Sequence, residues 1–182
     1  MQLSAKALAE KDSRQCTRVL HAIGDFERMG DHAVQLQRGA EELHTKKISF
    51  SPEARHEAER LKDAVSEIVR LTVRAFKTND IALAQRVEPL EQVIDDLLAK
   101  AKSGHIERLQ SGKCTIQMGF VQADMLTNFR RISDHCSNIA VAVIELQEGA
   151  FETHQYLTET KESGSNHFAE YYQEYSDKYW LR

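Results

Sequence analysis

Apolar residues recur along most of this chain at alternating spacings of three and four, which places them on one face of an α-helix. The pattern runs through long segments that are separated by short stretches of Ser, Gly, Asn and Asp. Helices that each bury such a stripe pack against one another along their length. The sequence therefore predicts an all-α fold, an antiparallel bundle of long helices followed by a short C-terminal helix.

Capping and turn residues predict where the first helices begin and end. Asp12 opens a capping box for a first helix that extends to about residue 44 or 47. Ser51-Pro52-Glu53 combines an N-cap, a first-turn proline and a first-turn acid, so it starts a second helix. The short Asn79-Asp80 turn makes the second and third helices antiparallel neighbours.

Residues that interrupt helices stand within the later pattern. We expect Pro89 to bend the third helix and Ser103-Gly104 to end it, so that a fourth segment begins at His105. Ser111-Gly112 then interrupts the chain ahead of the last long helix, which closes near Gly149. The pattern divides the chain into a lead-in segment (1–11), a helical bundle (12–150), and a polar linker with an aromatic-rich C-terminal segment (151–182).

An internal repeat lies within the first and the last long helix. The stretch Ile23–His32 returns in altered form at Asn128–His135, about a hundred residues later. Aligning Phe26 with Phe129 pairs Asp31 with Asp134, and the histidines that follow these aspartates also coincide. The two helices are therefore expected to play equivalent structural roles.

Composition and charge narrow the function. The chain has 182 residues, of which 41% are hydrophobic and 29% are charged, which describes one soluble domain. Its formal charge of -4 is spread along the sequence without a basic arm, which argues against a nucleic-acid partner. No apolar run approaches the roughly 20 residues of a membrane span. The three cysteines have no metal-ligand spacing and are expected to be buried free thiols in a reducing compartment.

Two sets of carboxylates follow helical spacing. Glu27 and Asp31, four residues apart, lie on the face of the first helix that points away from the core. Glu88, Glu91 and Asp95 form a ridge on the third predicted helix. Carboxylates at this spacing are able to bridge one hard cation, although they are also common on ordinary solvated helices, where they pair with arginines.

These motifs resemble those of a known family. The run Glu27–Asp31 looks like the acidic E/D-x-x-x-D signature of PhoU-type phosphate-regulatory proteins. The region Asp134–Ala140, with His105–Leu109 upstream, is similar to the PhoU-like domain at the cytosolic C-terminus of bacterial sodium/phosphate cotransporters. The resemblance covers roughly residues 12–150. It implies a non-catalytic regulatory domain on the cytoplasmic side of the inner membrane, whose partner is a membrane-embedded transporter portion encoded upstream in the same polypeptide.

The resemblance also implies a metal site. Proteins of this family hold metal clusters through paired acidic motifs on adjacent helices, so the cofactor would be an iron, zinc, manganese or calcium ion. The implied ligands are Glu27, Asp31, Glu91, Asp95 and Asp134, with His32 and His135 beside them.

Arg130 departs from the family pattern, because it stands where the first repeat has Glu27. A fixed cation there repels a metal, and we expect it to pair with Glu91 or Asp95 instead. The first predicted metal site, Glu27 and Asp31, lacks a second acidic motif for a different reason. Its acidic partner helix would belong to a first repeat of which only the third helix is recognisable, unless a second copy of the chain completes it.

Two alternative functions compete with that of a regulatory domain. Glu-x-x-His spacings occur twice near the first interhelical loop, as in di-metal carboxylate enzymes. Such enzymes place these ligands in mid-helix facing the core, whereas here both pairs flank a loop. The other alternative is a structural bundle whose apolar stripes form a homodimer. The residues of the di-metal alternative are Glu41, His44, Glu53 and His56.

Overall fold

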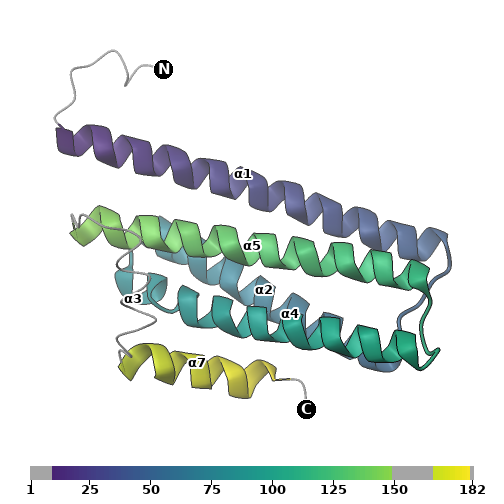
Figure 1. Ribbon diagram of the computed structural model, residues 1–182. Coiled ribbons are helices and arrows are strands. Elements are labelled where there is room, and N and C mark those ends of the chain that lie inside the picture. Colours follow the sequence, from purple (N-terminus) through teal and green to yellow (C-terminus); the bar gives the residue numbers. More distant parts are fainter. Residues whose placement is uncertain (1–9, 149–165, 181–182) are drawn as a thin grey trace.

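The computed structural model of the chain describes residues 10–148 and 166–180 (Figure 1). The described part of the chain is helical and contains no strand, so the predicted all-α bundle is confirmed. None of its helices combines the length and the apolarity that crossing a bilayer requires. The helices are α1 (Glu10–Thr45), α2 (Pro52–Thr78), α3 (Ile81–Ala84), α4 (Val87–Gln110), α5 (Ile116–Glu148) and α7 (Asn166–Tyr179).

Helix α5 is the central element of the bundle. It packs against α1 on one side and against α2 and α4 on the other, while α7 packs against α4. Figure 1 shows α1 at one edge of the molecule and α7 at the opposite edge. The repeated helices α1 and α5 are thus direct neighbours.

The core is built from the apolar stripes that the sequence predicts. The stripes of α2 and α4 are the most completely buried, because α2 and α4 pack on each other, on α5 and on α7. The α1 stripe is less covered, and its residues Ala33 and Ala40 are exposed. Side chains with no exposed surface include Leu61, Ile68, Leu90, Ile94 and Leu97.

The predicted helix starts and turns are present between α1 and α4. The Ser51 hydroxyl accepts a hydrogen bond of 3.2 Å from the Ala54 backbone N–H, so Ser51 is the N-cap of α2. Asn79 adopts the left-handed conformation that ends α2, with φ of 54°. The Asp80 carboxylate then caps α3 through the Leu83 N–H at 3.1 Å.

Two predictions about the third helical pattern are wrong. Pro89 does not bend a helix, because a break after α3 lets α4 begin at Val87 and places Pro89 in its first turn, where proline needs no N–H partner. Ser103-Gly104 does not end the helix, which continues to Gln110. A Cβ atom on Gly104 would lie 2.7 Å from Glu57 Oε1, so this glycine serves close packing. Gly112, with φ of 70°, marks the real turn.

The three cysteines are free, but only Cys136 is buried. Burial raises the pKa of the Cys136 thiol to about 12, and this thiol lies 4.0 Å from Met29 Sδ in the α1–α5 interface. Cys16 and Cys114 are half-buried, so the prediction of burial is wrong for them.

Helix α7 belongs to the bundle through its aromatic side chains. Tyr175 is 1% exposed, and its oxygen accepts a hydrogen bond of 3.1 Å from Arg86 Nε. At the far end of the helix, Lys178 and Tyr179 both donate to the Glu67 carboxylate. Burial raises the pKa of Glu67, but these two hydrogen bonds outweigh it and hold the pKa below its usual value. The predicted linker, residues 151–165, lies outside the described residues.

Candidate functional site

The predicted acidic ridge on α4 faces α5. Glu88 Oε2 accepts a hydrogen bond of 2.5 Å from the Ser137 hydroxyl. Asp95 Oδ1 lies 3.1 Å from Arg130 Nη2, which confirms the expected pairing of Arg130 with one of the ridge carboxylates. Asp134 lies 3.6 Å from Arg131 on the same helix. The ridge is therefore occupied by contacts with arginine and serine.

The predicted pair Glu27 and Asp31 lies on α1, whereas this ridge lies on α4. Both side chains are exposed on α1, as expected. Within residues 10–148 and 166–180, no three His, Cys, Asp or Glu side chains group as a metal-ligand set. Metal binding at these five carboxylates remains a prediction.

The two repeat histidines meet in the α1–α5 interface, where the sequence analysis did not place them. The rings of His32 and His135 stack with centroids 5.8 Å apart. His135 Nδ1 lies 2.8 Å from Asp25 Oδ1, and His32 Nδ1 lies 2.8 Å from Asn128 Oδ1. Since carboxylate and amide oxygens only accept, both Nδ1 atoms carry the proton.

These contacts define an approximate two-fold axis. In the repeat alignment Asn128 is the equivalent of Asp25, and His32 is the equivalent of His135. The His32–Asn128 contact is therefore the equivalent of the His135–Asp25 contact. The stacked rings lie on the axis. Arg130 on α5 contacts α4 through Asp95, although its side chain is 51% exposed, whereas Glu27 at the equivalent α1 position is exposed. The equivalent positions of the two repeats therefore differ in their surroundings.

A buried ion pair joins the start of α2 to the end of α4. Arg108 donates two hydrogen bonds of 2.7 Å to the two oxygens of Glu57. The side chains are 10% and 14% exposed. The hydrogen bonds that Arg108 donates to Glu57 outweigh burial and raise the pKa of Arg108. Sequence reasoning missed this pair, since neither residue stands out by spacing.

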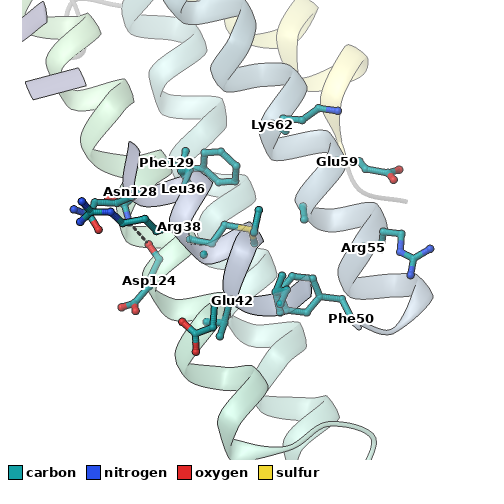
Figure 2. A pocket seen from close by; sticks show the side chains of 17 residues that line it. Leu36, Arg38, Glu42, Phe50, Arg55, Glu59, Lys62, Asp124, Asn128 and Phe129 are labelled. Atoms are coloured by element: carbon teal, nitrogen blue, oxygen red, sulfur yellow. Dashed lines mark hydrogen bonds between the residues drawn. The ribbon is translucent and has the colours of Figure 1, made fainter. Parts of the chain in front are cut away.

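A groove of about 640 Å³ lies between α1, α2 and α5 (Figure 2). Leu36 and Phe129 lie at one end of it and Phe50 at the other. Figure 2 shows Arg55, Glu59 and Lys62 along the α2 side. Its charged side chains are three basic and three acidic, so the groove favours no net ligand charge.

The ligands of the di-metal alternative do not face the core. All four of these side chains are exposed around the α1–α2 connection. Di-metal enzymes of the bundle type project their ligands inward, so the geometry does not support this alternative.

The fold and the ridge define a class, a helical bundle with an internally repeated helix whose outer faces carry carboxylates and arginines. The family profile of the PhoU domain matches residues 58–143, which include most of α2 and α5 and all of α4. This segment of the chain is therefore similar to a PhoU domain.

Curated relatives extend the likeness over more of the chain. A "Phosphate-specific transport system accessory protein PhoU homolog 1" of Thermotoga maritima is 26% identical over 139 residues, which cover 76% of this chain and 59% of the relative. A "Phosphate-specific transport system accessory protein PhoU homolog" of Pseudomonas aeruginosa is 27% identical, over 92% of this chain and 69% of the relative. The protein of the same name from Pseudomonas putida is 28% identical, over 85% of this chain and 60% of the relative. The chain thus spans about three fifths of the first relative. No solved structure matches it.

Proposed function

We propose that this chain is a non-catalytic regulatory module of phosphate transport. The observation that carries the proposal is the PhoU match, which falls on the helices that form the bundle core. The names of three relatives, all accessory proteins of a phosphate-specific transport system, support the same role. The module acts on the cytoplasmic side of the inner membrane through contact with a membrane-embedded phosphate transporter.

The transporter partner is the membrane portion of a sodium/phosphate cotransporter in the same polypeptide. A second candidate is a separate accessory protein, which the names of the relatives favour. Immunoblotting of the native host with an antibody to the bundle distinguishes them by size. A band in the membrane fraction well above 20.8 kDa supports the fused protein, and a smaller band in the soluble fraction supports the accessory protein.

Deleting the segment for residues 12–148 from the native gene is expected to uncouple phosphate uptake from external phosphate. A regulator acts on a transporter only if it binds one conformational state of the transporter more tightly than another. Deleting the module removes this difference in binding. Uptake of radiolabelled phosphate at low and high external phosphate measures this. Unchanged uptake under both conditions, with the transporter present at normal amounts, would contradict the regulatory role.

Metal binding is the second part of the proposal. Glu91 and Asp95 of the ridge, together with Asp134 on α5, bind a hard cation weakly, because Arg130 pairs with Asp95. Arg130→Glu removes that cation and restores the carboxylate that the first repeat has at Glu27. We expect affinity for manganese or calcium to rise by about tenfold or more in isothermal titration calorimetry.

Arg74→Glu is the matched control for this charge reversal. Arg74 is exposed on α2, away from the ridge, so the same change of charge there should leave the titration unchanged. Adding Asp95→Ala to Arg130→Glu should cancel the gain. An affinity that is equal in the wild type and in the Arg130→Glu variant would refute metal binding at the ridge.

A further inference from the structure

A thiol and an imidazole meet where α4 turns into α5. Cys114 Sγ lies 3.7 Å from His105 Nδ1 and 3.9 Å from the His105 carbonyl oxygen. The other two cysteines have no such neighbour. Cys136 is enclosed in the core, and Cys16 makes no hydrogen bond with any residue that the structure describes. Cys114 is therefore the cysteine that has a base beside its sulfur.

Backbone hydrogen bonds fix the turn that carries Cys114. The Lys113 N–H donates to the Arg108 carbonyl oxygen at 2.8 Å, which closes the end of α4. The Thr115 hydroxyl accepts a hydrogen bond of 3.2 Å from the Met118 N–H and so caps the start of α5. Cys114 thus stands directly ahead of the N-terminal end of α5, where the helix dipole favours negative charge.

The His105 ring is held in place by α5. A Cβ atom on Gly119 would lie 2.6 Å from His105 Nε2, so the half-buried ring packs directly on a glycine. An imidazole that carries its proton on Nε2 leaves Nδ1 able to take the proton of the thiol. Glu107, two residues further along α4, is exposed and lies about 200° around the helix from His105. The ring therefore presents a basic nitrogen to the sulfur.

The acids of this region are already engaged with cations. Arg108 holds both oxygens of Glu57. Beyond these hydrogen bonds, attraction by the Cys114 thiolate and by Glu53 also raises the pKa of Arg108. Hydrogen bonding lowers the pKa of Glu53, and attraction by Lys113 and Arg108 adds to this effect. The sulfur thus has cations within electrostatic reach, which is typical of reactive cysteines.

We propose that Cys114 is a reversible modification site that reacts with disulfides of small thiols. His105 Nδ1 takes the thiol proton, and the thiolate sulfur attacks one sulfur atom of the disulfide. A new S–S bond joins Cys114 to half of the reagent as the old S–S bond breaks. The leaving thiolate receives the proton from His105. Cys114 is oxidised and the released thiol is reduced, so the disulfide is the whole oxidant.

Glutathione disulfide is the probe that tests the site. The purified chain is incubated with it near neutral pH, and mass spectrometry of peptides follows each cysteine separately. Cys114 should be labelled about tenfold faster than Cys16, although both side chains are half-buried, and buried Cys136 should stay unlabelled. In concentrated urea the rates at the three cysteines should agree within about threefold, because unfolding removes the neighbouring groups. Dithiothreitol should reverse the labelling.

His105→Gln tests the role of the imidazole. It should slow labelling at Cys114 by about tenfold and leave the rate at Cys16 unchanged, because only Cys114 loses its base. His21→Gln is the matched control, since this histidine is exposed on α1, and it should leave both rates unchanged. Circular dichroism checks that both variants remain folded.

Two results would overturn the proposal. One is a folded wild-type chain in which Cys114 reacts no faster than Cys16. The other is a folded His105→Gln variant that keeps the wild-type rate at Cys114. The comparison of the folded chain with the chain in urea needs no variant, so the proposal stays testable even where His105→Gln destabilises the bundle. Labelling of the purified chain involves no transporter and no phosphate, so its result is independent of the regulatory role.

Discussion

Arg108→Met is expected to destabilise the bundle by about 3 to 5 kcal/mol. The substitution keeps an apolar stem of similar length but leaves the Glu57 carboxylate in a site where only 14% of the side chain is exposed. Arg108 supplies both of the hydrogen bonds to the carboxylate that the structure shows, at 2.7 Å each. A buried carboxylate without its partner loses hydration without compensation. Urea unfolding followed by circular dichroism measures the free energy of unfolding.

The double variant Glu57→Leu with Arg108→Met separates loss of the pair from loss of packing. It should recover most of the stability, because apolar replacement of a whole buried pair is often neutral. Lys46→Ala provides a surface control, since the Lys46–Glu42 pair is about half exposed and should contribute less than about 1 kcal/mol. An Arg108→Met variant within about 1 kcal/mol of the wild type would show that Glu57 is hydrated.

Tyr175→Ala is expected to cost about 3 to 5 kcal/mol of unfolding free energy. Tyr175 is 1% exposed and is the largest of the fully buried side chains. Its removal leaves a cavity between α7 and α4, and it also takes from Arg86 Nε its hydrogen-bond acceptor. Thermal unfolding and urea unfolding should both shift, because α7 melts together with the bundle.

Tyr175→Phe distinguishes packing from the hydrogen bond. It keeps the ring and loses only the acceptor for Arg86, so we expect a loss of about 1 kcal/mol. An early transition for Tyr175→Ala that leaves the main transition unchanged would show that α7 is attached only loosely to the bundle.

Much of the fold is predictable because helical periodicity is a local signal. The stripes of α2 and α4 are apolar at every third or fourth position, and the structure buries them. Ser51 and Asn79 mark the ends of α2 through backbone chemistry that depends on few neighbours. Gly104 misleads for the opposite reason. Its role is set by Glu57, 47 positions away in the sequence, and no local pattern reports that approach.

The candidate site is predictable only in part. The pairing of Arg130 with the ridge follows from comparing the two repeats, since Glu27 shows what the equivalent position holds. The stacking of His32 on His135 was not predicted, although the repeat contains the signal. When two equivalent helices pack antiparallel, a residue near the middle of their interface meets the equivalent residue of the other helix. In this chain the two residues that meet are histidines.

The near-symmetry of α1 and α5 has a thermodynamic consequence. Contacts of a helix with its own duplicate are the kind that two separate molecules make in a dimer, and such association weakens on dilution. Here a single polypeptide carries both partners, so the connecting residues fix their effective concentration. The His32–His135 stack therefore persists however scarce the protein is in the cell.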